Sequence, residues 1–201
     1  QPDSSLFLFA PNLRQFAHLN YSDSKSTSLY DSSDYHVSWQ LIKDHRIQSD
    51  FDNDNINTEQ NESSLFSIQS SFNKQLNEEL DVVYGETIII EPRFPDGSTM
   101  QHVGLFADMT KYFTHQDLTF GLRYSDYNID LNNPLIANDS LKIDDLTWHV
   151  GLLHHIDNDN NLFANLGRGF RPPNIFDLGQ VGERPGNRFN VINTDVKPET
   201  V

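Results

Sequence analysis

Hydrophobic and polar residues alternate with a period of two along most of this chain. In the stretch at residues 118–125, LTFGLRYS, the apolar side chains Leu118, Phe120 and Leu122 are separated by small or polar residues. Successive side chains of a β-strand point to opposite faces, so this pattern predicts a strand with one apolar and one polar face. The same alternation occurs at residues 35–42, 66–72, 102–109, 146–153 and 162–167, and less regularly at 13–21 and 80–90. No segment has a helical period long enough to predict a helix.

The segments that connect these predicted strands alternate in length. Three are short and polar, at residues 73–79, 114–117 and 157–161, and three are longer and rich in Asp, Asn, Ser, Pro and Gly, at residues 48–62, 91–101 and 132–144. Outer-membrane β-barrels show this rhythm, with tight turns at one end and long loops at the other. The first connection, at residues 22–34, should be short in this scheme and is not.

Alternation alone does not separate a soluble β-sandwich from a membrane barrel, because both have one apolar face. The predicted strands are about 10 residues long, near the roughly 9–11 residues that cross a bilayer, whereas soluble strands average roughly 5–6. Tyr and Trp favour the membrane interface. Aromatic residues gather near the predicted strand ends: Tyr84, Tyr112, Phe113, Tyr124, Tyr127 and Trp148. The pattern therefore favours an all-β fold, an antiparallel transmembrane β-barrel, present in part as an up-and-down meander of roughly eight strands. The alternative is a soluble β-sandwich binding module, which would bury the apolar stripe between two sheets.

The composition narrows the possible functions. The chain has 201 residues, no Cys, 36% hydrophobic residues and a formal charge of -15. This negative charge disfavours a nucleic-acid partner, because phosphates are repelled. No apolar run approaches the roughly 18 residues of a membrane helix, but a barrel strand turns only every second residue to lipid. No G-x-S-x-G or H-E-x-x-H motif is present, so the sequence predicts no catalytic residue, no cofactor and no enzyme activity.

Two short boxes mark the last 40 residues. The first box consists of Phe170, Arg171, Pro172 and Pro173, and the second contains Asn193, Lys197, Pro198 and Glu199. Their order resembles the barrel of TonB-dependent outer-membrane receptors, which often carry a strand ending in F-R-x-P, a long external loop and an N-x-x-L-K-P-E-type box. An upstream hairpin, GLFA at residues 104–107 and LTFGLRY at residues 118–124, is similar to one that these receptors show.

This resemblance implies part of an energy-coupled receptor in the outer membrane of a Gram-negative-type cell. Residues 1–201 would all be barrel, and the plug domain and the C-terminal strands are expected to lie outside this chain. Such receptors move a scarce ligand inward, for example a ferric siderophore or another ferric chelate, with energy from the TonB protein complex acting through the plug. Lipopolysaccharide and other outer-membrane lipids would surround the wall. A passive porin-like barrel would share the alternation but would not account for the two boxes.

The boxes and the segment between them contain the candidate ligand contacts. Arg171, Arg184, Asn187 and Arg188 could meet an anionic chelate, although Arg171 could instead pair with a carboxylate of the wall or plug. The two prolines should end strand pairing and begin the loop, because Pro has no N–H group. Haem-binding members of the family place a His between the boxes. Residues 171–195 contain none, which disfavours haem and leaves ferric siderophores, cobalamin and saccharides open.

No metal site is predicted from the sequence. His154 and His155 are adjacent on a predicted strand and point to opposite faces, so they cannot hold one ion together. The acidic run at residues 50–55 supplies oxygen atoms of the kind that Ca²⁺ prefers. It has Asn, however, at the sixth and twelfth positions of the loop, where an EF-hand requires Gly and Glu. This run is interpreted as a solvated external loop.

Overall fold

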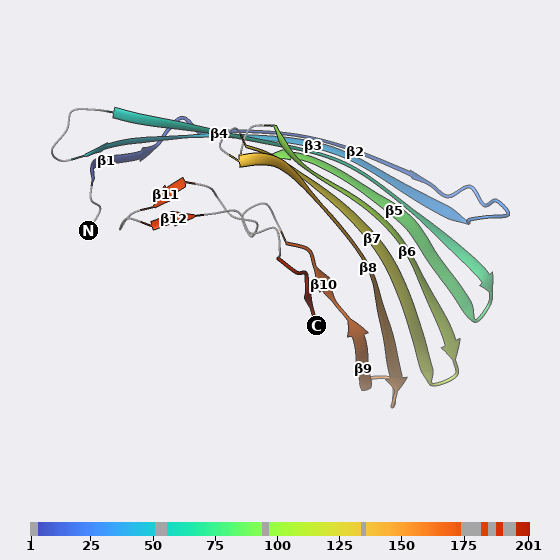
Figure 1. Ribbon diagram of the computed structural model, residues 1–201. Helices are drawn as coiled ribbons and strands as arrows, with labels where there is room; N and C mark the ends of the chain where they lie inside the picture. The colour runs from blue at the N-terminus through green and yellow to red at the C-terminus, as the bar shows by residue number, and fades with distance from the viewer. Residues whose placement is uncertain are drawn as a thin grey trace.

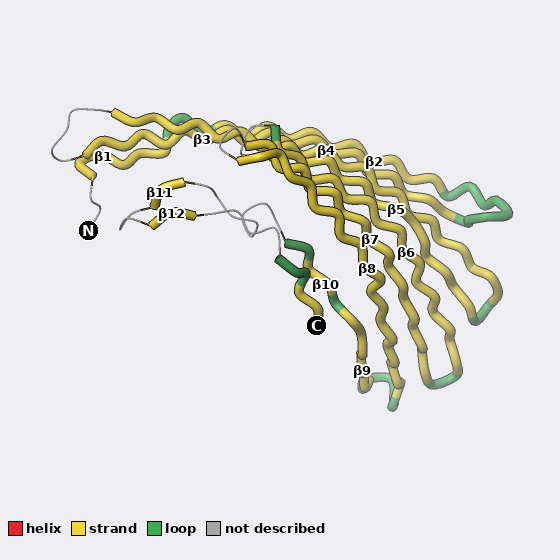
Figure 2. Tube along the Cα trace, in the orientation of Figure 1, coloured by secondary structure: helices red, strands yellow, loops and turns green. Residues whose placement is uncertain are grey.

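The structure, a computed structural model, consists of β-strands and their connections. It describes residues 4–50, 56–93, 97–133, 136–173, 182–184, 188–190 and 196–201. These residues contain strands, turns and loops but no helix (Figure 2). Accordingly, the described part of the chain has no helix that is long and apolar enough to cross a membrane.

Nine strands of the described chain form one antiparallel sheet (Figure 1). They are β1 (Ser4–Phe9), β2 (Leu13–Asp23), β3 (Ser32–Asp50), β4 (Ile56–Asn77), β5 (Leu80–Arg93), β6 (Ser98–Phe113), β7 (Gln116–Asn133), β8 (Ile136–His155) and β9 (Asn161–Arg168). From β3 to β9 each strand pairs with the next in sequence. The predicted up-and-down meander is therefore confirmed. Two small pairs complete the fold: β10 (Phe170–Arg171) with β13 (Glu199–Thr200), and β11 (Gly182–Arg184) with β12 (Arg188–Asn190).

Strands β1 and β2 share one edge of β3. Strand β1 pairs with the far end of β3, at residues 46–50, and β2 pairs with residues 33–43. The two strands are separated by Ala10, Pro11 and Asn12. Pro11 has no N–H group for the ladder, which suits a break between two strands on the same edge.

The strands run much further than the alternation predicted. Strand β4 has 22 residues and β8 has 20. At about 3.3 Å per residue, β4 spans roughly 70 Å, more than twice the roughly 30 Å hydrocarbon thickness of a bilayer. The predicted long loops at residues 48–62, 91–101 and 132–144 are therefore wrong in extent, because most of their described residues belong to strands. The extension of β4 at residues 57–62 is polar on both faces, so it lacks the alternation from which strands were predicted. In the extension of β8, Leu141 and Ile143 do alternate, and they pair with Ile129 and Tyr127 of the concave face.

The apolar stripe lies on the convex face of the sheet. The sheet is curved, and β10 to β13 lie inside the curve (Figure 1). Tyr127 contacts Phe170 of this inner segment, so the odd-numbered positions of β7 face inward. The even-numbered Leu118, Phe120 and Leu122 then face outward, with exposed fractions of 41, 38 and 39%. A β-sandwich, which would bury these side chains between two sheets, is wrong.

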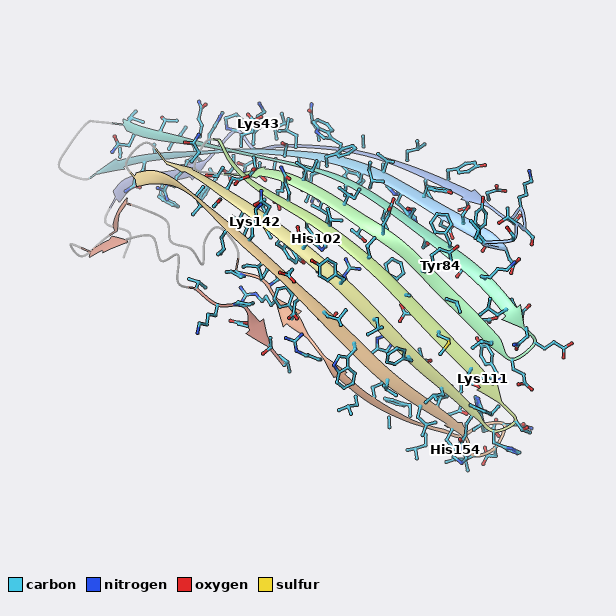
Figure 3. The ribbon with its side chains drawn as sticks, turned by 45° about the vertical axis from the view of Figure 1, so that its right-hand side comes forward. Lys43, Tyr84, His102, Lys111, Lys142 and His154 are labelled. Atoms are coloured by element: carbon cyan, nitrogen blue, oxygen red, sulfur yellow. The ribbon has the colours of Figure 1, made fainter. Side chains whose placement is uncertain are left out.

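A row of aromatic rings crosses the convex face near the turn end of β2 to β5. Tyr21, Tyr35, Phe72 and Tyr84 follow one another with ring centroids 6.1, 5.8 and 5.3 Å apart. A belt of this kind is typical of a membrane interface. Figure 3 shows Tyr84 and Lys111 toward this end, and Lys43 and Lys142 toward the other.

Other predicted belt residues lie elsewhere. Tyr124 and Trp148 lie inside β7 and β8, because these strands continue beyond the predicted ends. Tyr127 is on the concave face, where it stacks on His102 with ring centroids 4.2 Å apart. Its assignment to the lipid interface is wrong, since the parity of β7 turns it away from the convex side.

The unexpectedly long connection between β2 and β3 is tied to the neighbouring strands. Lys74 of β4 donates a hydrogen bond to the Thr27 carbonyl oxygen at 2.9 Å, and the Tyr84 hydroxyl of β5 donates to the Leu29 carbonyl oxygen at 3.0 Å. The connection therefore covers the ends of β4 and β5. Its length, which breaks the rhythm of short turns, is explained by these contacts.

Asp31 is the charged centre of this connection. Its carboxylate accepts hydrogen bonds from Lys74 at 2.8 Å, from the Ser26 hydroxyl at 2.7 Å and from the Gln75 backbone N–H at 2.9 Å. These bonds, that from Lys74 first, lower the pKa of Asp31 from 3.8 to about 2. Hydrogen bonds to a carboxylate favour its charged form.

The stability that Asp31 contributes should depend on pH. A depressed carboxyl pKa stabilises the folded state above the unfolded pKa of 3.8, and this contribution falls as the pH drops toward about 2. We expect Asp31→Asn to destabilise the protein at pH 6 and to have a much smaller effect at pH 2. Urea denaturation of both proteins at the two pH values measures this difference. An effect that is equal at pH 6 and pH 2 would contradict the assignment, and Asp23→Asn, at the end of β2, is the control.

Candidate functional site on the concave wall

Glycines on the concave face make room for side chains of adjacent strands. Gly85 lies opposite Phe106, and Gly121 lies opposite His149. A Cβ atom at Gly121 would collide with the His149 ring, and one at Gly85 would collide with the Ser70 backbone carbonyl and lie 3.0 Å from the Phe106 ring. Glycine in a strand interior marks such a close approach. On the concave wall, larger side chains of neighbouring strands therefore occupy the space above these glycines.

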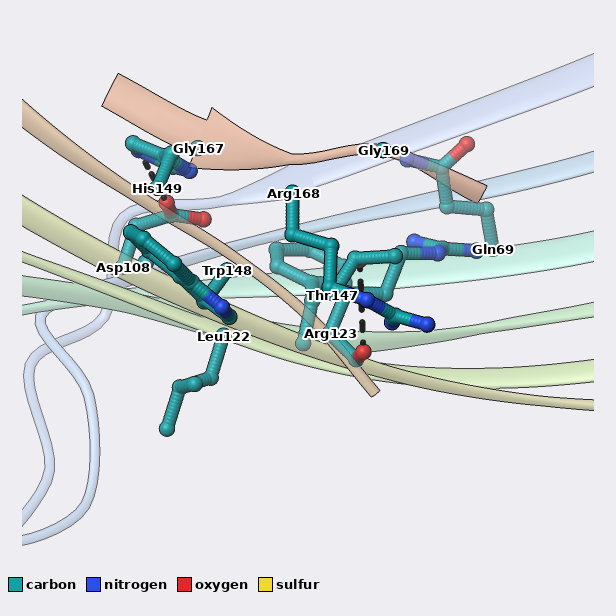
Figure 4. Close-up of a pocket in the computed structure, with 12 residues that line it drawn as sticks. Gln69, Asp108, Leu122, Arg123, Thr147, Trp148, His149, Gly167, Arg168 and Gly169 are labelled. Carbon is teal, nitrogen blue, oxygen red and sulfur yellow. Dashed lines mark hydrogen bonds and ion pairs between the residues drawn. The ribbon is translucent and has the colours of Figure 1, made fainter. Parts of the chain in front are cut away.

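Asp108, Gly121 and His149 lie in one row across β6, β7 and β8. The Asp108 Oδ1 and His149 Nε2 atoms are 3.3 Å apart, and they meet over the space that Gly121 leaves. Half of the His149 side chain remains exposed. This pair forms part of a pocket of about 520 Å³, shown in Figure 4.

Two arginines line the same pocket in different electrostatic states. Arg168 donates hydrogen bonds to the Asp145 carboxylate at 2.6 Å and to the Leu146 carbonyl oxygen at 2.7 Å, so its charge is compensated. Arg123 lies over Gly104 and donates a hydrogen bond to the Ser125 hydroxyl at 3.2 Å. Within the described residues Arg123 has no carboxylate partner. The pocket therefore offers a cationic group that can accept an anionic partner.

An apolar cluster occupies the concave face nearer to the loop end. Ile129 is fully buried and Leu131 is 6% exposed, and Val196 from the end of the chain packs against them. Phe170 adds an aromatic contact with Tyr127 at 6.0 Å. These contacts hold the two boxes of the sequence against the inner wall of the sheet.

The two sequence boxes meet in space. Phe170 pairs with Thr200 and Arg171 with Glu199, and Gly169 and Val201 exchange two backbone hydrogen bonds of 2.9 and 3.1 Å. Strand β10 ends at Arg171, immediately before the proline pair, as the missing N–H of Pro172 predicts. Pro173 is buried. The two boxes therefore hold together the two ends of the segment that separates them in the sequence.

Arg171 pairs with a carboxylate of the second box. Its Nη1 atom lies 3.1 Å from the Glu199 carboxylate, and both side chains are more than half exposed. An exposed pair of this kind contributes about 0–1 kcal/mol. We expect Arg171→Ala, Glu199→Ala and the double variant to show a coupling energy below about 1 kcal/mol in urea titrations. A coupling of several kcal/mol would contradict this, and Lys111→Ala with Glu79→Ala, another exposed pair, is the comparison cycle.

The remaining candidate contacts are only partly described. Arg184 and Arg188 lie opposite each other in the β11–β12 hairpin. Asn187 and Asn193 lie outside the described residues, as does the acidic run at residues 51–55. Their role as ligand contacts stays a prediction. Lys197 and Pro198 precede β13.

His154 and His155 have different surroundings: the His154 Nδ1 atom is buried without a hydrogen-bond partner among the described residues, whereas the His155 ring is held on both nitrogens. The His155 ring contacts the carboxylate of Asp117 at 3.0 Å and the side-chain oxygen of Asn161 at 2.9 Å. Among the described residues no group of three or more His, Asp or Glu side chains is arranged to hold a metal ion.

Sequence reasoning missed the pocket residues Asp108, Arg123 and His149. The face on which each of them lies could be predicted, because each occupies a polar position of an alternating strand. What brings them together is the register of β6, β7 and β8, which the sequence does not specify. The sequence signal that could have pointed to the pair is Gly121, a glycine inside a predicted strand, which marks a close approach of neighbouring side chains.

The chain belongs to the TonB-dependent receptor-like β-barrel family. Residues 3–201 match the family described as "TonB dependent receptor-like, beta-barrel". No curated protein matches the sequence. Family membership fits the meander, the outward apolar stripe and the polar concave wall.

Solved structures share this fold at low sequence identity. A copper transporter, OprC, superposes with a TM-score of 0.79 at 16% identity, covering 96% of this chain and 35% of that protein. The ferric-catecholate import receptor Fiu from E. coli K12 gives 0.67 at 15% identity, with coverages of 94 and 37%. The FrpB iron transporter from Neisseria meningitidis gives 0.65 at 14%, with coverages of 82 and 28%. The chain therefore spans about a third of the length of these proteins.

Proposed function

We propose that this chain is a wall segment of an energy-coupled receptor in the outer membrane of a Gram-negative-type cell. The receptor imports a scarce ligand such as a ferric siderophore. It takes energy from the TonB complex through a plug domain that lies outside this chain. Its surroundings are lipopolysaccharide and other outer-membrane lipids, and its activity is transport, not catalysis.

The separation of the two faces of the sheet supports this proposal best. The convex face carries exposed Leu, Phe and Tyr side chains, which suit acyl chains. The concave face carries the Asp108–His149 pair, Arg123 and Arg168, which suit an aqueous or plugged interior. The three similar proteins are a copper transporter, an iron transporter and a ferric-catecholate import receptor. The metal-chelate ligand is inferred from them.

A passive porin-like barrel is the competing function. It would have the same faces but no dependence on TonB. The meeting of the two boxes on the concave wall favours the receptor, because a simple barrel strand pair needs neither box.

Uptake measurements in iron-starved cells test the proposed function. Radio-iron is supplied on a catecholate, a hydroxamate and citrate to cells that express the complete receptor and to cells that lack its gene. We expect gene-dependent uptake of at least one chelate, and its loss when TonB is deleted. Equal uptake with and without TonB would establish passive diffusion. If none of the three chelates showed gene-dependent uptake, the ferric-chelate assignment would be overturned.

A further inference from the structure

Two histidines stack face to face on the concave side of the β2–β3 hairpin. The rings of His18 and His36 have centroids 5.7 Å apart and an interplanar angle of 7°. The Phe16 ring lies on the other side of His18, at 6.2 Å. In the ladder His18 lies opposite Ser38, and His36 lies opposite Gln69. The two imidazoles are thus diagonal neighbours on adjacent strands, a spacing from which long or aromatic side chains can touch.

The register places this pair on the same face as the pocket described above. The row that contains His36 continues through Gln69 and Thr87 to Gly104. Gly104 is the glycine over which Arg123 lies, and Gln69 lines the 520 Å³ pocket. His18 and His36 border their own pocket of about 340 Å³. Both rings therefore face the concave side and not the apolar convex side.

Neither imidazole has a polar partner within the described chain. No hydrogen bond or ion pair involves the ring of His18 or His36, whereas His155 is held by Asp117 and Asn161, and His149 by Asp108. Ser38, which could have served the pair, instead shares a hydrogen bond of 2.7 Å with Ser67. The ring nitrogens of the pair are therefore available to an external ligand.

The chemistry of two available imidazoles on one wet face points to a metal ion. Neutral imidazole suits Cu²⁺, Zn²⁺ and Ni²⁺, and Cu²⁺ binds most tightly in the first-row series. We propose that His18 and His36 form a two-histidine binding site for a divalent transition-metal ion on the concave wall, with Cu²⁺ preferred. Water molecules in the adjacent pocket would complete the coordination. The proposal does not depend on which ligand the receptor transports.

The site requires a small adjustment of the rings. An ion at about 2.0–2.1 Å from each nitrogen brings the two nitrogens to within about 4 Å of each other. Parallel rings 5.7 Å apart hold equivalent nitrogens further apart than that. The rings must therefore tilt toward each other by roughly 1.5 Å, given these metal–nitrogen lengths. Neither ring is held by a hydrogen bond within the described residues, so no such bond opposes this tilt.

Copper binding by the complete receptor tests the proposal. The purified receptor, in detergent, is titrated with Cu²⁺, and the bound ion is followed by electron paramagnetic resonance, which reports coordinated nitrogens. We expect one ion coordinated by two imidazole nitrogens at this site. The variants His18→Gln and His36→Gln should each lose that two-nitrogen signal and weaken Cu²⁺ binding at least tenfold.

Two further variants make the result decisive. His115→Gln, in the exposed turn between β6 and β7, should bind Cu²⁺ as the wild type does. The double variant His18→Gln with His36→Gln should bind no more weakly than either single variant, because one site is lost in all three. Heat-dependent gel migration shows whether each variant has folded. Both histidines are replaced singly, so the site is tested even if only one of the two variants folds. Wild-type Cu²⁺ affinity in a folded His18 or His36 variant would overturn the site.

Discussion

Replacing Gly85 with alanine should destabilise the folded barrel by about 3 kcal/mol or more. A Cβ at this position would collide with the Ser70 backbone carbonyl of the adjacent strand, and it would lie 3.0 Å from the Phe106 ring. A backbone atom inside a sheet cannot move aside without breaking ladder hydrogen bonds, so overpacking here lies at or above the usual cost of about 1–3 kcal/mol. Urea titration of the complete receptor refolded into lipid vesicles measures the change.

Gly151→Ala is the matched control for Gly85→Ala. Its nearest atom would be the Asn165 side-chain oxygen at 2.8 Å, which belongs to a rotatable side chain. Asn165 can turn away, so the expected loss is below about 1 kcal/mol. If the two variants were equally stable, the tight approach of β4 and β5 at Gly85 would be refuted.

Placing an arginine at Phe120 should cost about 2–4 kcal/mol. Phe120 lies on the convex face in the middle of an apolar row with Met109 and Val150. A cationic side chain on the lipid face of a barrel is penalised by that amount near the bilayer midplane. The same vesicle-based urea titration applies, and the variant should also fold less efficiently into thicker bilayers.

The adjacent position provides the control for that variant. Thr119 is the next residue of β7, so its side chain points to the concave face. Its Cα partners are Thr110 and Gly151, and its hydroxyl shares only a long hydrogen bond of 3.4 Å with Thr110. We expect Thr119→Arg to change stability by less than about 1 kcal/mol. Comparable losses at positions 119 and 120 would argue against opposite environments for the two faces.

The face of each residue could be predicted from the sequence where one side is apolar and the other is wet. The stretch at residues 118–125 illustrates this, since its alternation correctly assigned Leu118 and Leu122 to one face. The extent of the strands could not be predicted in this way. Residues 56–62, INTEQNE, belong to β4, yet both faces there are polar, so hydrophobic alternation carries no signal. The ladder hydrogen bonds to β3 hold this extension, and they depend on backbone groups common to all residue types.

The candidate site could not be predicted from the sequence, because its contacts join residues that are far apart along the chain. Arg171 and Glu199 were both singled out, one as a strand-end cation and one as part of a box, but their pairing arises from the β10–β13 register. Asp108 and His149 meet only because β7 presents a glycine between them. Tyr127 was assigned to the wrong face because its strand continues past the predicted interface. For the two pairs the missing information was the cross-strand register, and for Tyr127 it was the length of β7 and the parity of the residue within it.

Cysteine scanning along β7 tests the central assignment of the two faces most directly. The 201 residues contain no Cys, so single cysteines at positions 117 to 124 can be spin-labelled without removing others from this segment. In lipid vesicles, labels at Leu118, Phe120 and Leu122 should collide mainly with oxygen dissolved in the bilayer. Labels at Thr119, Gly121 and Arg123 should collide mainly with a water-soluble nickel complex. The account predicts a strict period of two with this phase, and the opposite phase, or uniform accessibility, would contradict it.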